Sequence, residues 1–258
     1  GNDYLARSLT GALAYYTYKH DQVKDLNPVV YSLARFYFPE SRQFDYFVVQ
    51  TEEKYYEQAF WQATPMMGRP WVMESHYPEA YFEILKENCD AYDGKKLEPF
   101  VATLVENVYA NRFSADNKTV VHFYNDTGKL VNESLMAVGV NPTVHYFDLI
   151  NLKEVPVSEQ GTIGTTIAPD TAASIAMLPR LLIGKLADNK LTILFDGKKL
   201  EAESTLSIRI YDAAKKLVEA REHVCRDEVF NVSNYNTSSF SVKLLQDGIL
   251  LDAIEVNR

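Results

Sequence analysis

The chain has 258 residues and a formal net charge of −9, from 26 Lys and Arg against 35 Asp and Glu. This acidic balance argues against the basic surface that nucleic acids or anionic membranes require. Hydrophobic residues make up 47% and charged residues 24%, which excludes a disordered or fibrous protein. No stretch reaches about 18 uncharged apolar residues, so we expect no membrane-spanning helix.

The two cysteines, Cys89 and Cys225, are far apart and belong to no CxxC pair. We expect two buried or half-buried thiols, no structural zinc site and no cofactor. His122 and His145 fall in expected strands and lack a third ligand at metal-binding spacing, so we expect both to be structural.

The aromatic content and the spacing of apolar residues change near residue 96. Of the 32 Phe, Tyr and Trp residues, 20 fall in residues 1–96. Apolar residues at three and four spacing before this point predict helices, and alternating runs after it predict strands. The expected helices cover residues 3–18, a short segment around 33–37, 52–63 and 78–92. Two short apolar runs, 44–49 and 70–73, lie between these helices.

This order of strands and helices is typical of a parallel sheet or barrel. A complete eight-stranded βα-barrel takes about 250 residues. Residues 1–96 are therefore either the closing part of a barrel or a helical layer on the β region. In the helix expected at 78–92, the apolar face would consist of Phe82, Leu85, Cys89 and Tyr92.

Residues 97–258 predict two antiparallel β-sandwiches, one over 97–187 and one over 188–258. Residues 108–113 and 119–125 are predicted to form a hairpin. The last module has six expected strands, a pattern typical of a small immunoglobulin-like sandwich. Its predicted core consists of Leu191, Ile193, Ile208, Ile210, Phe230, Phe240, Val242, Leu250 and Ile254. The fold class is thus a multidomain α+β protein, with a helix-rich barrel remnant over 1–96.

Three stretches resemble the β-sandwich behind the catalytic barrel of large bacterial glycoside-hydrolase-like proteins. They are Val108-Tyr-Ala-Asn-Arg-Phe113, Val121-His-Phe-Tyr-Asn-Asp-Thr-Gly128 and His145-Tyr-Phe-Asp-Leu-Ile-Asn151. Upstream, Arg35-Phe-Tyr-Phe-Pro39 and Ala63-Thr-Pro-Met-Met-Gly-Arg-Pro-Trp71 are similar to the closing βα units of such barrels. The resemblance covers roughly residues 30–180 and rests on structural rather than catalytic motifs.

The resemblance implies a C-terminal portion of a glycoside-hydrolase-like protein with a TIM-type barrel. The first two-thirds of that barrel are absent here, so a missing segment or a second chain would complete it. It also implies a secreted, periplasmic or cell-surface location, although the chain starts without a signal peptide. The expected partner is a carbohydrate, with no nucleic acid and no membrane span.

Two carboxylates are the candidate catalytic groups, because glycoside hydrolysis usually needs a pair. Glu74 follows the run 70–73, where a barrel strand would end and active sites are built. It is a candidate general acid, although a loop carboxylate near a helix start also fits. Asp45 lies inside an apolar run, where a structural ion pair with Arg35 or Arg42 is the alternative to a substrate contact.

Aromatic and imidazole side chains around Glu74 are the candidate substrate-binding groups. Trp71 and Tyr77 offer ring faces to the C–H face of a sugar, and His76 adds a polar group. Tyr55, Tyr56 and Trp61 stand at helical spacing, which favours a core position for them.

Three interpretations remain open. The first is an enzyme fragment with part of a barrel. The second is a non-catalytic carbohydrate-binding or scaffolding protein. The third is a subunit that docks a partner through residues 1–96.

Overall fold

The computed structural model describes residues 14–19, 36, 42–47, 53–64, 66–68, 79–93, 96–195, 205–224 and 227–258. For residues 14–19, 42–47, 53–55 and 66–68 it describes the backbone alone. Among the described residues, no helix is long and apolar enough to cross a membrane.

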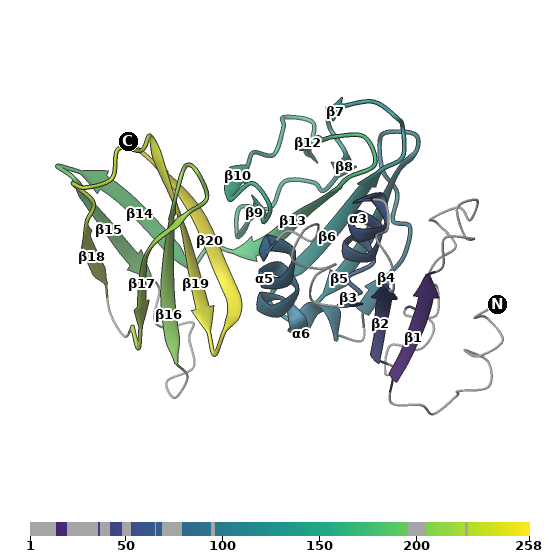
Figure 1. Ribbon diagram of the computed structural model, residues 1–258. Helices are drawn as coiled ribbons and strands as arrows, with labels where there is room; N and C mark the ends of the chain where they lie inside the picture. The colour runs from purple at the N-terminus through teal and green to yellow at the C-terminus, as the bar shows by residue number, and fades with distance from the viewer. Residues whose placement is uncertain are drawn as a thin grey trace.

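The N-terminal region contains a three-stranded parallel sheet in the order β1-β2-β3 (Figure 1). Its strands are β1 (Ala14–Lys19), β2 (Arg42–Phe47) and β3 (Met66–Gly68). Helix α3 (Glu53–Trp61) connects β2 to β3, as parallel pairing requires a crossover. The strand expected at 44–49 is confirmed over residues 44–47, and the helix expected at 52–63 is confirmed over residues 53–61.

The helix expected over residues 3–18 is wrong at its C-terminal end, because residues 14–18 belong to β1. The segment Ala-Tyr-Tyr-Thr-Tyr-Lys is rich in aromatic and β-branched residues, which favour strands. Parallel pairing with β2 along the whole strand decides between the two periodicities. Strand β3 was not expected, and the run 70–73 lies outside the described residues.

The helix expected at 78–92 is divided into α5 (Glu79–Glu87) and α6 (Cys89–Tyr92). The break falls at Asn88, whose side-chain amide donates a 2.9 Å hydrogen bond to the Ile84 carbonyl. The expected apolar face is wrong for Phe82, which is 41% exposed, and for Cys89, which is an exposed free thiol rather than a buried or half-buried one. It is confirmed for Tyr92, which is buried, and for Leu85, which packs against the core. The buried face consists of Tyr81, Ile84, Glu87, Ala91 and Tyr92.

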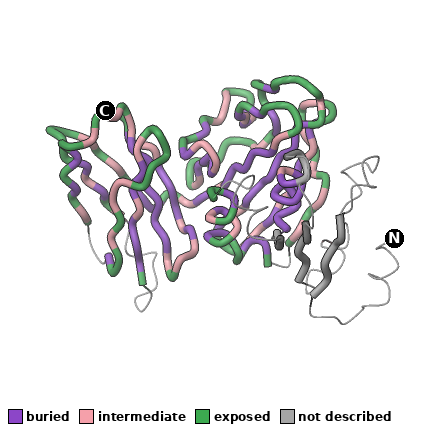
Figure 2. Tube along the Cα trace, in the orientation of Figure 1, coloured by how far each residue is buried: buried purple, intermediate pink, exposed green. Residues whose placement is uncertain are grey.

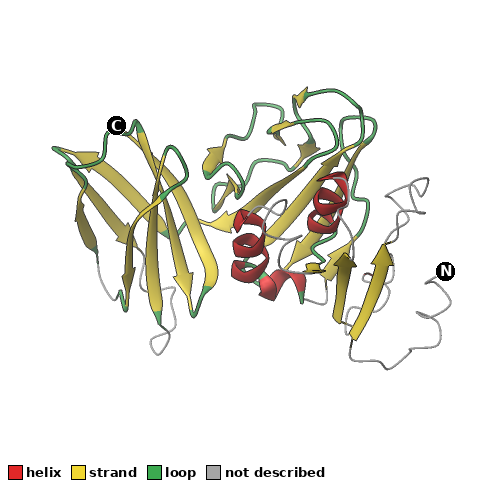
Figure 3. Ribbon diagram, viewed as in Figure 1, coloured by secondary structure: helices red, strands yellow, loops and turns green. Residues whose placement is uncertain are grey.

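The middle region is built on a six-stranded antiparallel sheet in the order β10-β9-β13-β6-β5-β4 (Figure 1). Helices lie against one face of this sheet (Figure 3). Its strands are β4 (Lys96–Glu98), β5 (Val108–Ser114), β6 (Thr119–Asn125), β9 (Val144–Asp148), β10 (Lys153–Val155) and β13 (Ala172–Pro179). The hairpin predicted between β5 and β6 is confirmed.

Two hydrophobic cores lie on opposite faces of this middle sheet. Its strands β6 and β13 are accordingly buried along most of their length (Figure 2). Side chains of a strand alternate between faces, so Phe113 and Val120 enter one core and Ala110 and Val121 the other. Helices α3, α5 and α6 cover the first face, here called the helix face. Two short ribbons cover the second, here called the ribbon face: β7 (Val131–Asn132) with β12 (Thr166–Ile167), and β8 (Met136–Ala137) with β11 (Thr162–Ile163).

The C-terminal region is a sandwich of two antiparallel sheets, called here the last sandwich. One sheet has the order β14-β15-β18, formed by β14 (Leu182–Ala187), β15 (Lys190–Phe195) and β18 (Glu228–Asn231). The other has the order β17-β16-β19-β20, formed by β16 (Leu206–Asp212), β17 (Leu217–Glu222), β19 (Ser239–Gln246) and β20 (Ile249–Asn257). The boundary expected at residue 188 falls between β14 and β15, which pair along their length.

All nine predicted core residues of the last sandwich are buried. Eight of them pack in its own core, but Leu250 packs in the core of the helix face, together with Tyr211 and Ala253. The last sandwich therefore shares part of its buried surface with the helices.

Truncation of Phe240 tests the core of the last sandwich. Phe240 is fully buried, so Phe240→Ala should lower the free energy of unfolding by about 3 to 5 kcal/mol. Val229→Ala is the matched control, because Val229 is 53% exposed on the same sandwich. Urea denaturation measures both variants, and equal stabilities would contradict the assigned core.

Candidate functional site

Four residues of the predicted site lie outside the described residues: Trp71, Glu74, His76 and Tyr77. Along the chain they fall in the connection between β3 and α5. Their roles as catalytic or substrate-binding groups stay predictions.

Asp45, the second predicted carboxylate, belongs to β2. Its backbone pairs with Thr17 of β1 and with Met66 of β3. It therefore lies on the middle strand of the parallel sheet. A catalytic role for Asp45 stays a prediction too.

Tyr56 and Trp61 of α3 belong to the core, as their spacing indicates, whereas the side chain of Tyr55 lies outside the described part of the chain. Tyr56 and Trp61 are each 1% exposed. The Trp61 ring lies 5.8 Å from Phe100, 6.3 Å from Tyr109 and 5.9 Å from Tyr124, centroid to centroid. These two residues of α3 do not form an accessible platform for sugar stacking.

The C-terminus of α3 ends in a Schellman motif. Ala63 has φ 50°, and its amide donates to the Phe60 carbonyl at 2.8 Å. The Thr64 amide donates to the Ala59 carbonyl at 2.9 Å. The left-handed conformation usually favours glycine, so Ala63 is held there by its surroundings, where it is 1% exposed.

His122 of β6 connects this helix end to the middle sheet. Its Nδ1 lies 2.6 Å from the Phe60 carbonyl and its Nε2 lies 2.8 Å from the Tyr92 hydroxyl. A carbonyl only accepts, so Nδ1 carries the proton and Nε2 accepts from Tyr92. The Asn111 amide adds a bond to the Trp61 carbonyl at 3.4 Å. The imidazole is thus a structural group that fixes both α3 and α6.

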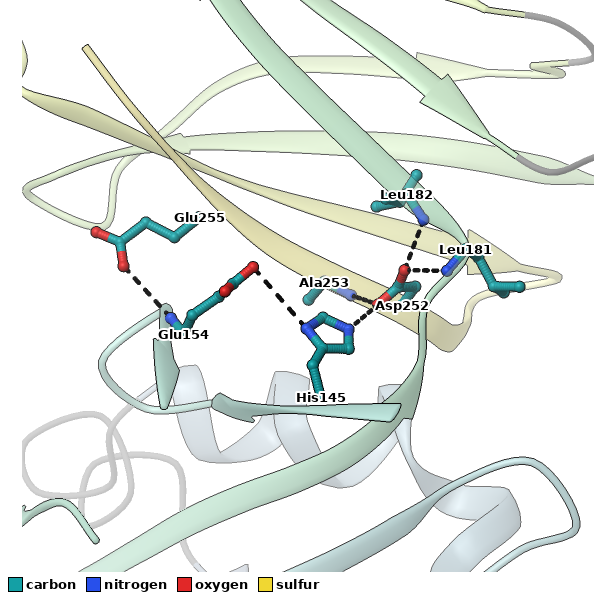
Figure 4. A network of polar contacts seen from close by, with 7 residues as sticks. All are labelled: His145, Glu154, Leu181, Leu182, Asp252, Ala253 and Glu255. Carbon is teal, nitrogen blue, oxygen red and sulfur yellow. Dashed lines mark hydrogen bonds and ion pairs between the residues drawn. The ribbon is translucent and has the colours of Figure 1, made fainter. Parts of the chain in front are cut away.

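Asp252 of β20 is the centre of a buried network between the middle sheet and the last sandwich (Figure 4). One carboxylate oxygen accepts from the Leu181 and Leu182 amides, both at 2.7 Å. The other accepts from His145 Nε2 at 2.6 Å and from the Ala253 amide at 2.7 Å. Four donors therefore meet one fully buried side chain, and both of its oxygens have partners.

His145 is the link from this network to the middle sheet. Its Nδ1 lies 3.9 Å from a Glu154 carboxylate oxygen on β10, and the Glu154 amide donates to Glu255 of β20 at 3.3 Å (Figure 4). Strands β9 and β10 are therefore both joined to β20. The structural role expected for His145 is confirmed.

A second polar cluster joins α5 to the last sandwich. The carboxylate of Glu87 binds Lys243 and Arg209, each at 2.8 Å. The Glu87 and Lys243 side chains are both 2% exposed. The Lys118 ammonium donates to the carbonyls of Glu87 and Leu250, and lies 2.9 Å from Asp90.

The buried acids of the described residues are Glu87, Asp148 and Asp252, and all three are saturated with donors. Asp148 accepts from the Thr165 hydroxyl at 2.6 Å and from the Asn151 amide at 2.8 Å. Such groups stabilise the fold rather than react with a substrate. Within the described residues, no group of three or more His, Cys, Asp or Glu side chains is placed to hold a metal ion.

Two hollows among the described residues are large enough to receive a ligand. One, of about 470 Å³, follows residues 100–110 and is lined mainly by that single segment. The other, of about 350 Å³, lies on the ribbon face and is called the ribbon-face hollow. Side chains from seven strands line it, and they include the Glu98–Arg112 ion pair.

The sequence predicts part of the lining of the ribbon-face hollow. Arg112, Ser114 and Thr119 are polar residues at alternating positions of a predicted hairpin, which signals one outward face. Their meeting with Tyr146 and Met177 depends on strand order, which the sequence alone does not supply.

Replacing Asp252 tests the network in Figure 4. Asp252→Ala removes the acceptor of all four donors and should lower the free energy of unfolding by about 3 to 5 kcal/mol. Asp252→Asn keeps one accepting oxygen and should cost less. Glu255→Ala, on the same strand, serves as the control, with one 3.3 Å bond to lose. Chemical denaturation would refute the assignment if the alanine variants of Asp252 and Glu255 were equally stable.

Lys118 predicts a pH dependence of stability. Burial lowers the pKa of its ammonium below the ordinary 10.5, and Asp90 opposes part of this shift. At pH values between the lowered pKa and 10.5, Lys118 binds its proton more tightly in the unfolded chain than in the folded protein. Lys118 therefore makes the free energy of unfolding rise with pH in this range. Lys118→Met should remove the rise, while Lys153→Met at an exposed position should keep it. Denaturation curves between pH 8 and 10.5 measure the difference, and identical slopes would reject the assignment.

No protein-family model matches this chain, and no curated protein matches it. Solved structures that are similar to parts of it include an Anoxybacillus alpha-amylase (9% identity, TM-score 0.37, 54% of this chain and 38% of that one). Another is a gamma-cyclodextrin glucanotransferase from Bacillus clarkii (11% identity, TM-score 0.35, 83% and 39%). A third is a family 30 endoxylanase from Clostridium papyrosolvens (10% identity, TM-score 0.34, 63% and 48%).

These similar structures are carbohydrate-active enzymes by their descriptions. This chain covers between 38% and 48% of their lengths. The TM-scores lie below 0.5, which is too low a likeness to assign this chain to a family.

Proposed function

We propose that this chain is the C-terminal portion of a glycoside-hydrolase-like, carbohydrate-active protein. In this proposal, β1 to β3 and their helices are the closing part of a βα-barrel. The middle sheet and the last sandwich are the β modules behind that barrel, and the last one is immunoglobulin-like.

The parallel sheet carries the proposal. Its strands follow chain order, each is parallel to the next, and α3 connects β2 to β3. Successive strands of a βα-barrel have this order, and parallel sheets are normally covered on both faces. Three parallel strands are too few to close a barrel, so further strands would come from another segment or a second chain.

The predicted site fits this architecture by its place along the chain. Residues 69–78 follow the carboxyl end of β3, and barrel enzymes build their sites from the segments that follow strand ends. Glu74 would act as the general acid or base there, with Asp45 as the second carboxyl group. Trp71, His76 and Tyr77 would hold the sugar.

A non-catalytic carbohydrate-binding or scaffolding protein is the second candidate. The observation that favours it is the ribbon-face hollow, which joins apolar side chains to a charged pair without a barrel. Both proposals place the protein outside the cytoplasm, because polymeric glycans occur there.

The test of the enzyme proposal is Glu74→Gln in the full-length native protein that contains this chain. The change keeps the shape of the side chain but removes its acid, so turnover of a cleaved glycan should fall by about 100-fold or more. Hydrolysis of a panel of starch, xylan, cellulose and galactan oligosaccharides measures the loss.

Glu79→Gln is the matched control, because Glu79 is an exposed residue five positions further on. It should leave turnover at the wild-type rate. If Glu74→Gln also keeps wild-type turnover, Glu74 is not the acid. If the wild type cleaves no glycan but binds one, the second candidate is correct.

A further inference from the structure

The ribbon-face hollow has a floor made of side chains that lie side by side on neighbouring strands. In one row, Arg112 of β5 pairs with Glu98 of β4 on one side and with Val121 of β6 on the other. Val121 in turn pairs with Ile175 of β13. The row therefore changes from charged to apolar along its length.

The second row shows the same change of polarity. Ser114 of β5 pairs with Thr119 of β6, and their hydroxyl oxygens lie 3.1 Å apart. Thr119 pairs with Met177 of β13, and Met177 with Tyr146 of β9. The two rows together give a floor with one polar half and one apolar half.

The ribbon of β8 and β11 forms the wall on the apolar side. Met136 and Ile163 are buried there, while Ala137 is exposed. The Tyr146 hydroxyl lies 3.7 Å from the Met177 sulfur. Burial raises the pKa of Tyr146, so its hydroxyl stays neutral and can donate a hydrogen bond.

The polar half is accessible to a ligand. The side chains of Arg112 and Glu98 are 35% and 54% exposed, and they lie 3.3 Å apart. Their opposite charges compensate each other, which favours a neutral ligand over an anion or a cation. A carboxylate and a guanidinium side by side offer hydrogen-bond acceptors and donors to the hydroxyl groups of such a ligand.

We propose that the ribbon-face hollow is a glycan-binding site, in which a sugar ring lays its C–H face on Met177 and its hydroxyls on Arg112, Glu98 and Thr119. A volume of about 350 Å³ lies at the small end of ligand sites and suits one or two sugar rings. This inference rests on the proposed carbohydrate function, but it concerns a surface away from Glu74.

The five methionines of the chain separate the two sites in one experiment. Met136 and Met177 line the hollow. Met66 and Met67 belong to β3, and Met73 directly precedes Glu74 in the sequence. Protein labelled with carbon-13 at the methionine methyl groups therefore reports binding at either place. Methionine-to-leucine variants assign the signals.

The labelled chain is titrated with maltoheptaose, xylohexaose, cellohexaose and galactooligosaccharides. The proposal expects at least one glycan to shift the Met136 and Met177 signals. Arg112→Met should weaken that glycan at least tenfold, and Thr119→Val, which keeps the side-chain volume, should weaken it two- to fivefold. Arg221→Met is the control, because Arg221 also pairs with a glutamate, Glu228, but lies in the last sandwich. It should bind as the wild type does.

Three outcomes would overturn the proposal. One is that no glycan shifts Met136 or Met177. Another is that a glycan shifts Met66, Met67 or Met73 alone, which would support the barrel site and reject the hollow. The third is equal weakening by Arg112→Met and Arg221→Met in variants with wild-type melting temperatures. The hydrolysis test of Glu74 is independent, so loss of the hollow leaves the proposed function standing.

Discussion

The buried ion pair between Glu87 and Lys243 fixes the contact between the helices and the last sandwich. A charge without a partner in this position would be strongly unfavourable, so each residue requires the other. Arg209 and Lys118 add further bonds to the same short segment of α5. Together with the Asp252 network, these contacts join the last sandwich both to the helices and to the middle sheet.

The β part of the fold could be predicted well from the sequence, because alternation identifies a strand without knowledge of its partners. The core of the last sandwich followed from that pattern alone. The helical part was harder to predict. The segment of β1 satisfies both periodicities, and only pairing with β2 decides between them. The buried face of α5 also differs from the face predicted from its apolar residues. The reason is that Glu87 is held inside by charged side chains more than 100 positions away in the sequence.

The candidate sites differ in what the sequence can reveal. A carboxylate, an imidazole and two aromatic rings within residues 71–77 are visible as a local cluster, so a site could be predicted there. The ribbon-face hollow is assembled from strands that are distant in sequence, and its two rows exist only through strand order and register. A slip of one residue in β13 would turn Met177 to the helix face and remove the apolar half.

Leu250, Ala253 and Tyr211 give the last sandwich one face that belongs to the core of the helices. This limits how such a module can be exchanged between proteins in evolution or in engineering. A gene fusion that moved residues 182–258 alone would carry that apolar face into water, with Lys243 separated from Glu87. The unit that can be transplanted therefore includes the middle sheet and its helices as well as the last sandwich.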